Sequence, residues 1–236
     1  MRAIILAAGI GKRLLPLTRD IHKCLVEVGG KPIIKHQLDT LKYYGISDVI
    51  IVGGYRIDQI KDYLKNTVTY VFNPIYKETN SVYSLWLAKE FMGGDDVLVF
   101  NADLMVDPSI IKELIERKSD LCTVVDMGKW NPTGYKVVIG DHKVIDMGMD
   151  LKKEETSGEY AGMTKITKSK LKAVVEMLGR YISEKRVNDW YEAAFVSMLK
   201  EGHAMDYVGT NGRWWVEIDY KEELEKTREY FDRIRN

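Results

Sequence analysis

The feature that most constrains the fold is an alternation of two kinds of segment through the first half of the chain. Short apolar runs rich in β-branched residues, such as residues 3–8, 48–54 and 96–103, are separated by amphipathic stretches, such as residues 31–45 and 108–118. Parallel strands need a crossover of a dozen or more residues, and that crossover is usually a helix. The pattern therefore predicts an α/β fold whose mostly parallel sheet carries helices on both faces.

From about Gly134 the pattern changes to shorter alternating runs, at residues 135–140, 143–149 and 159–166. Helical stretches follow these runs. We predict antiparallel strands and helices added to the edge of the sheet, where a second substrate could be held. The chain shows no repeat, low-complexity tract or linker, so one domain over residues 1–236 is expected.

Composition excludes several function classes. Thirty-five basic residues balance thirty-five acidic ones, so no overall field attracts nucleic acid or an anionic membrane. The two cysteines, Cys24 and Cys122, are too few for a disulfide framework and lack metal-site spacing. We interpret them as reduced thiols of a cytoplasmic protein. Lys12 and Arg13 interrupt the apolar start too early for a signal peptide, and no membrane insertion is expected.

Against this neutral background, one loop gathers glycines and cations. Residues 6–23, LAAGIGKRLLPLTRDIHK, leave the first predicted strand at the sheet edge where ligands of such folds bind. The N–H groups of a glycine-rich turn suit phosphate oxygens, and the cations add charge. A solvated turn with ordinary surface cations is the alternative interpretation.

Two familiar phosphate motifs do not fit this loop. A dinucleotide fingerprint requires a third glycine where Leu14 stands, and Pro16 interrupts the helix that should follow. A P-loop requires glycine where Leu6 stands. A dehydrogenase is disfavoured for the same reasons.

The loop instead resembles the signature of nucleotidyltransferases that make nucleoside-diphosphate sugars and alcohols. The matching pattern is L-A-A-G-x-G-x-R-L followed by K-x-L-x-x-V-x-G-K-P, spread over residues 6–32, with His22 where these enzymes usually have proline. Residues 71–91 are similar to a segment of the small cytidylyltransferases that act on phosphocholine and related phosphoalcohols. Residues 100–107 and 215–224 resemble the two segments that carry metal-binding aspartates.

This resemblance implies a Rossmann-like domain that transfers CMP from CTP to a phosphoalcohol and releases pyrophosphate. Arg13 would bind the β- and γ-phosphates, Lys23 would reach the α-phosphate, and Asp103 and Asp219 would hold Mg²⁺. The other nucleotide-binding positions it implies are Leu6, Ala7, Ala8, Gly9, Gly11, Lys12, Thr79, Asn80, Ser81 and Ala102.

The implied reaction needs no nucleophilic side chain. The second pKa of a phosphomonoester is about 6, so the acceptor phosphate is largely dianionic at neutral pH and attacks without a general base. Catalysis then consists of aligning two polyanions and neutralising the charge that builds on the α-phosphate. A loop with glycines and several cations suits that task.

Structural interpretations remain open for some of these residues. Asp219 and Glu222 fit a capping box of the last helix, and Asn80 and Ser81 fit a helix N-cap, a role that can coexist with base binding. We assign Asp107, which precedes Pro108, to capping.

The acceptor is less constrained. Trp190, Tyr191 and Glu192 could form an aromatic cage with a carboxylate for a quaternary ammonium, although Trp190 could equally belong to the core. Gly134 and Tyr135 stand where the phosphocholine enzymes have a tryptophan, so one wall of such a cage is missing. Lys136 resembles instead a strand position of enzymes acting on polyol and sugar phosphates, and a lysine beside the site disfavours a cationic headgroup. Glu159 and Glu192 could bind hydroxyl groups.

We therefore expect inositol 1-phosphate as the acceptor. The alternatives are phosphocholine, an aminoalkyl phosphate or phosphonate, and a sugar 1-phosphate. A regulatory subunit that binds nucleotide without chemistry is the alternative from another class; it would lack the metal carboxylates or Lys23, which this chain keeps.

We expect three functional parts within the one domain. Residues 1–127 would bind the nucleotide, residues 128–210 the acceptor, and residues 211–236 would carry the second metal motif and the last helix. Edge strands of the second part could pair across a homodimer.

Overall fold

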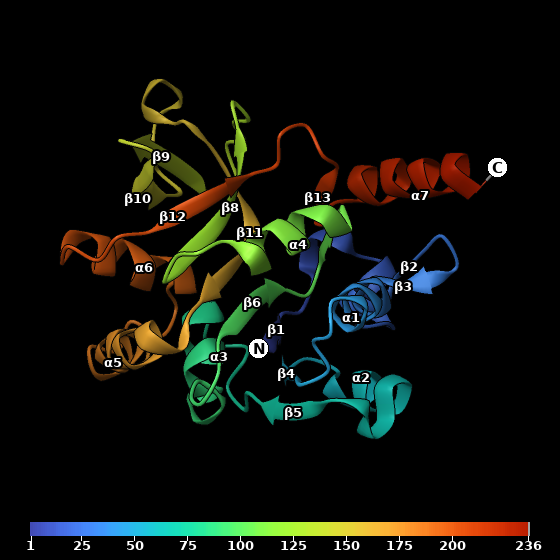
Figure 1. Ribbon diagram of the computed structural model, residues 1–236. Helices are drawn as coiled ribbons and strands as arrows, with labels where there is room; N and C mark the ends of the chain where they lie inside the picture. Colours follow the sequence, from blue (N-terminus) through green and yellow to red (C-terminus); the bar gives the residue numbers. More distant parts are fainter. Residues whose placement is uncertain (236) are drawn as a thin grey trace.

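The computed structural model describes residues 1–235, and its central element is a nine-stranded mixed sheet (Figure 1). Four parallel strands lie in the order β6 (Val97–Asn101), β1 (Arg2–Ala7), β4 (Val49–Gly53) and β5 (Thr69–Phe72). The chain adds β4 and β5 on one side of β1 and then returns to its other side for β6. This reversal of strand order leaves a crevice at the carboxyl ends of β1 and β6, where ligands of open sheets bind.

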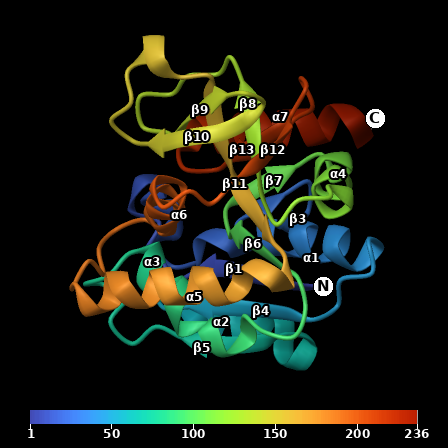
Figure 2. The same cartoon turned by 60° about the vertical axis from the view of Figure 1, so that its left-hand side comes forward.

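Helices cover both faces of the sheet, as the alternating segments predict (Figure 2). One face carries α1 (Ile33–Tyr43), α2 (Ile57–Leu64) and α4 (Pro108–Glu116), and the other carries α3 (Ser81–Leu87), α5 (Lys168–Ser183) and α6 (Tyr191–Lys200). Successive residues of a strand point to opposite faces. Ile4 of β1 accordingly packs with α3, α5 and α6, whereas Ile5 packs with α1, α2 and α4.

The second half adds the strands β8 (Leu121–Met127), β9 (Lys136–Gly140), β10 (Lys143–Gly148), β11 (Gly158–Ile166) and β12 (Asp206–Gly209). The predicted antiparallel region is present, but two details differ. β12 runs parallel to β8, and β11 lies inside the sheet between β6 and β8 rather than at its edge.

The polar residues of β11 explain this difference. All nine residues of the strand are buried. The Thr164 hydroxyl donates to the Thr123 hydroxyl, and the Lys165 ammonium donates to the carbonyl groups of Ile115 and Arg117. In the sequence, a buried strand whose polar side chains have interior partners shows the same alternation as a half-exposed strand.

Two short strands connect the end of the chain to the segment that follows β6. β13 (Trp215–Glu217) pairs antiparallel with β7 (Leu104–Val106), and α7 (Lys221–Arg235) follows. The predicted cap of α4 is confirmed, since the Ser109 N–H donates to Asp107 Oδ1 at 2.9 Å. Within residues 1–235, no helix has the length and apolar character needed to cross a bilayer.

The remaining elements are short. They are the hairpin strands β2 (Glu27–Val28) and β3 (Lys31–Pro32), and the 3-10 turns η1 (Lys12–Leu14), η2 (Leu17–Arg19), η3 (Lys23–Leu25), η4 (Lys65–Thr67), η5 (Lys89–Phe91) and η6 (Lys153–Glu155).

Candidate active site

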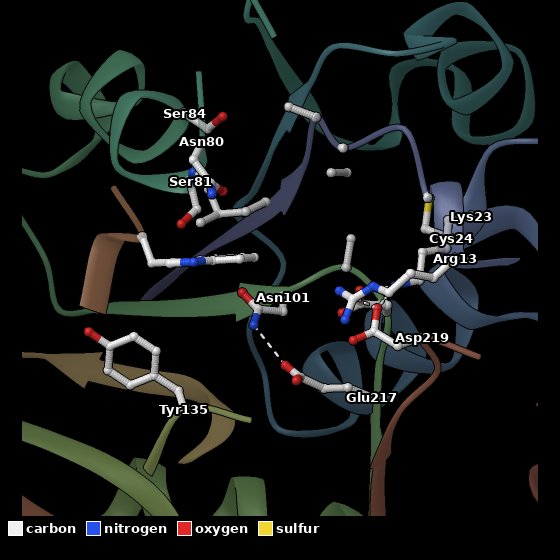
Figure 3. Close-up of a pocket in the computed structure, with 18 of the residues that line it drawn as sticks. Arg13, Lys23, Cys24, Asn80, Ser81, Ser84, Asn101, Tyr135, Glu217 and Asp219 are labelled. Carbon is white, nitrogen blue, oxygen red and sulfur yellow. Dashed lines mark hydrogen bonds and ion pairs between the residues drawn. The ribbon is translucent and has the colours of Figure 1, made fainter. Parts of the chain in front are cut away.

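A cavity of about 550 Å³ opens at the carboxyl ends of β1 and β6. Figure 3 shows Arg13, Lys23 and Asp219 gathered at one end, with Asn80, Ser81 and Tyr135 at the other. Most of the site residues predicted from the sequence line it: Leu6, Ala7, Ala8, Gly9, Gly11, Lys12, Arg13, Lys23, Thr79, Asn80, Ser81, Ala102, Asp103, Tyr135, Trp190, Glu192 and Asp219.

The loop after β1 folds back on itself through η1 and η2 and returns to the cavity at η3. Gly11 has a φ of 68°, a left-handed conformation that favours glycine. A Cβ at this position would lie 3.2 Å from Lys23 Cβ, and the Thr18 hydroxyl donates to the Gly11 carbonyl at 2.7 Å. The two arms of the loop are therefore closely packed, and Lys23 stands beside the glycine turn.

Two cations and two carboxylates meet at the end of the cavity where phosphate binding is predicted, called the phosphate end below. The Lys23 ammonium pairs with Asp103 and, at 2.6 Å, with Asp219 Oδ1. Arg13 Nη2 lies 3.0 Å from the same Asp219 oxygen. Burial opposes the charged form of Lys23, but the two carboxylates outweigh it and raise the pKa of the ammonium above its ordinary value. Lys23 therefore remains charged at neutral pH.

Hydrogen bonds from distant segments fix the carboxylates. The buried Gln37 amide of α1 donates to the carbonyl groups of Asn101 and Leu104, both at 2.8 Å, and so holds the turn that carries Asp103. The Ile218 N–H donates to the Asp103 carbonyl at 3.0 Å. The pairing of β7 with β13 thus brings Asp219 to Asp103, although the two residues lie far apart in the sequence.

The capping-box interpretation of Asp219 is not what the structure shows. Its carboxylate contacts Lys23 and Arg13, while the side chain that accepts from the backbone N–H groups of Asp219 and Tyr220 belongs to Glu223, not Glu222.

Sequence reasoning missed Glu217 as a cavity residue. Glu217 is half-buried, and its carboxylate accepts from the Asn101 amide at 2.7 Å (Figure 3). Exclusion of water from the carboxyl group first, and the charge of Asp103 second, raise the pKa of Glu217 above its ordinary value. Gly162 has a φ of 65°, and a Cβ there would lie only 2.4 Å from Glu217 Oε1. The signal available was its place two residues before Asp219 in the segment WVEID.

The predicted base-binding segment begins α3 and is bonded to the start of α6. Asn80 Oδ1 accepts from the Ser81 N–H, so its N-cap role is confirmed. The Asn80 N–H donates to the Val187 carbonyl at 2.9 Å, and the Tyr191 N–H donates to the Ser81 hydroxyl at 2.9 Å. The segment at residues 79–82 therefore shares a hydrogen-bonded frame with residues 187–191.

The far end of the cavity combines aromatic rings with one buried carboxyl group. Tyr135, Trp190 and Glu192 line it, and Trp190 is 42% exposed, so it does not belong to the core. Glu192 Oε2 is buried without a hydrogen-bond partner among the described residues. Burial raises the pKa of this carboxyl group to about 8.

Three residues predicted to contact the acceptor lie behind the cavity wall instead. The Lys136 ammonium is buried and donates to the carbonyl groups of Pro132 and Met149. The Tyr191 hydroxyl bonds to that of Tyr160 inside the core. These bonds turn both polar groups inward, where they brace residues that do line the cavity.

Glu159 is the third residue behind the wall. It accepts from the Asn131 amide at 3.2 Å and pairs with Lys129 at 3.2 Å. A Cβ on Gly134 would lie 2.2 Å from its Oε1 atom, so the loop of residues 129–134 passes directly over this carboxylate. Glu159 therefore anchors the rim of the cavity.

Replacing Glu192 with Gln should flatten the pH dependence of stability. The folded-state pKa of about 8 lies above the ordinary value of 4.5. Between these values the folded chain keeps a proton that the unfolded chain releases, so the free energy of unfolding falls as the pH rises. The glutamine variant lacks this contribution.

Urea unfolding from about pH 5 to about pH 8 measures this contribution. Glu90→Gln, whose side chain is 80% exposed, should keep the wild-type slope; an equal slope in Glu192→Gln would contradict the prediction.

Comparison with known proteins agrees with this geometry. A family model described as Nucleotidyl transferase matches residues 2–217. The chain is 33% identical over 252 residues to the CTP:phosphoglutamine cytidylyltransferase of Campylobacter jejuni, covering 95% of this chain and 98% of that protein. It is 38% identical over 160 residues to the choline-phosphate cytidylyltransferase of Streptococcus pneumoniae, covering 64% and 65%.

Solved structures extend the comparison to the fold. The CTP:phosphocholine cytidylyltransferase of Streptococcus pneumoniae has a TM-score of 0.79 at 30% identity, covering 97% of this chain and 98% of that one. The inositol-1-phosphate CTP transferase of T. maritima has a TM-score of 0.83 at 20% identity, covering 100% and 96%, and supports the fold alone. With a family model that spans nearly the whole chain, and with the glycine loop, Lys23 and both aspartates in one cavity, the protein belongs to the nucleotidyl transferase family.

Proposed function

We propose that the protein transfers CMP from CTP to the phosphate of a small phosphorylated molecule and releases pyrophosphate. The observation that carries this proposal is the cluster of Arg13, Lys23, Asp103 and Asp219 at the end of the glycine loop. The choice of cytidine rests on the relatives, which are named as cytidylyltransferases.

In the proposed reaction an acceptor phosphate oxygen attacks the α-phosphorus of CTP, and the bond from that phosphorus to the pyrophosphate oxygen breaks. The dianionic acceptor needs no general base. The Lys23 ammonium neutralises charge on the α-phosphate, and the fork of Arg13 binds two oxygens of the leaving pyrophosphate. The glycine turn supplies backbone N–H groups to the same phosphates.

The residues present fit a magnesium ion. Mg²⁺ takes one or two carboxylates and completes its shell with water and phosphate oxygens. Asp103 Oδ1 is buried and accepts no hydrogen bond from any described residue, so it is free to serve as a ligand beside Asp219. Residues 1–235 hold no cluster of three or more His, Cys, Asp or Glu side chains suited to a metal. A magnesium ion whose coordination shell is completed by substrate oxygens does not need such a cluster. When bound, Mg²⁺ would neutralise phosphate charge.

The acceptor end favours a headgroup that carries nitrogen. The case for a polyol rested on the resemblance of the strand at Lys136, on Lys136 as a cation in the site, and on Glu159 and Glu192 as partners for hydroxyl groups. The Lys136 ammonium is bonded to carbonyl groups behind the wall, and Glu159 is paired there with Asn131 and Lys129. A buried carboxyl group at Glu192 beside Tyr135 and Trp190 suits an ammonium or N–H group. Inositol 1-phosphate is the second candidate, because a carboxylate also binds hydroxyl groups.

The test is pyrophosphate release with CTP and Mg²⁺, using phosphocholine, 2-aminoethylphosphonate, inositol 1-phosphate and a hexose 1-phosphate in turn. Turnover with a nitrogen-bearing acceptor, with a raised KM for that acceptor in Glu192→Gln, is the expected result. Preference for inositol 1-phosphate would support the second candidate. No turnover with any acceptor, with either CTP or UTP, would contradict the enzymatic proposal and favour a regulatory nucleotide-binding role.

A further inference from the structure

One buried imidazole joins the two ends of the phosphate loop. His22 is 2% exposed, and its Nε2 atom lies 3.0 Å from the carbonyl oxygen of Ala7, the last residue of β1. Its Nδ1 atom accepts from the Cys24 N–H at 3.2 Å and thereby caps η3. The ring therefore connects the residue where the loop leaves the sheet to the turn where the loop ends.

These contacts define the proton positions on the ring. Because Nδ1 accepts from a backbone N–H, Nε2 carries the proton and donates it to the Ala7 carbonyl. Burial lowers the pKa of His22 to about 4, so the ring is neutral at physiological pH. A single neutral tautomer makes both bonds at once, and a charged ring would lose the cap.

Lys23 directly follows this clamp. The His22 N–H also donates to Gln59 Oε1 at 2.7 Å, and the His22 carbonyl accepts from the Leu25 N–H at 2.8 Å. The polar groups of His22 are thus bonded to the end of β1, to α2 and to η3, the elements around Lys23. The ammonium of Lys23, in contrast, contacts the carboxylates at the phosphate end of the cavity.

We propose that His22 is a positioning residue whose ring holds the phosphate loop and Lys23 in the geometry that receives a triphosphate. The inference rests on the proposed nucleotidyl transfer. His22 borders the cavity, and in this scheme it acts through the backbone of Ala7 and the turn that carries Lys23.

The two bonds of the ring can be separated by substitution. The amide of His22→Asn can reproduce the acceptor at Nδ1 and keep the cap on Cys24, while that of His22→Gln can reach the Ala7 carbonyl in place of Nε2. His22→Ala removes both bonds. His36→Ala is the matched control, because His36 Nε2 also bonds to a backbone carbonyl, that of Val28, outside the phosphate loop.

The experiment compares the binding of CTP with that of cytidine, which lacks phosphates and depends on the base end of the cavity. In His22→Ala we expect CTP to bind roughly tenfold or more weakly and kcat/KM to fall by on the order of 100-fold, since a misplacement of about 1 Å has effects of that size. The affinity for cytidine should stay within about twofold of wild type. Asn and Gln should each recover part of the loss, and His36→Ala should bind both ligands as the wild type does.

Three results would overturn the inference. These are an unchanged CTP affinity in His22→Ala, an equal loss for CTP and cytidine, or an Asn and Gln pair no better than Ala. If His22→Ala does not fold by circular dichroism, the same comparison is made with the Asn and Gln variants. If the wild type binds another nucleoside triphosphate rather than CTP, the assignment of cytidine fails. The role of His22 is then tested by comparing the binding of that triphosphate with the binding of its nucleoside.

Discussion

Replacing Lys23 with Ala should lower kcat/KM for nucleotidyl transfer by on the order of 10² to 10³, the usual effect of removing one group that stabilises transition-state charge. The ammonium lies at the end of the glycine loop between Asp103 and Asp219, and within residues 1–235 no other lysine side chain is paired with either aspartate. Without it, the charge that builds on the α-phosphate loses the cation that the proposed reaction assigns to it. Steady-state pyrophosphate release measures the change.

The fold should survive this substitution. The side chains of Asp103 and Asp219 are 24% and 19% exposed, so water can solvate them, and Arg13 still pairs with Asp219. Lys172→Ala, whose side chain is 88% exposed on α5, is the control and should retain wild-type activity. Near-normal turnover in Lys23→Ala, with a native circular dichroism spectrum, would remove Lys23 from the catalytic machinery.

Replacing Asp103 with Asn should lower turnover by at least about 100-fold at low Mg²⁺, because a neutral amide is a poor ligand for a hard cation. Part of the loss should be recovered at higher Mg²⁺ concentration. Titration of activity against Mg²⁺ tests both expectations, and direct Mg²⁺ binding in the presence of CTP gives a readout separate from turnover.

The matched control for Asp103 lies four residues further along the chain. Asp107 caps α4, and Asn is as good an N-cap as Asp, so Asp107→Asn should change neither stability nor the dependence on Mg²⁺. An unchanged Mg²⁺ dependence in Asp103→Asn would show that this carboxylate is not a metal ligand.

The sequence predicts the parallel half of the fold well, because its buried strands and its amphipathic helices each have a recognisable pattern of apolar residues. β1, β4 and β6 are continuous apolar runs, and α1 and α4 are amphipathic. The position of β11 could not be predicted in this way. Its polar residues are satisfied by partners on β8 and α4, and such pairing is a property of the folded chain.

The phosphate end of the site was also accessible from the sequence, because its residues follow one another within the loop or stand at strand ends. The acceptor end was not. Lys136 and Tyr191 are charged or polar residues in suitable segments, yet the interior offers carbonyl and hydroxyl partners that turn their polar groups away from the cavity. A pattern of residue types reports which segment borders a site but not which way a long side chain points.

The hydrogen bonds between the start of α3 and the segment before α6 restrict how the enzyme could be retargeted to a new acceptor. They use the backbone of Val187 and Tyr191, and the Ser81 hydroxyl, but not the side chain of Trp190 or the carboxylate of Glu192. Exchanges at Trp190 and Glu192 can therefore reshape the proposed acceptor end while the proposed base-binding segment keeps its frame. Insertions or proline substitutions between residues 187 and 191 would disturb both ends together, so variant libraries for altered acceptor use should vary side chains there and keep the chain length constant.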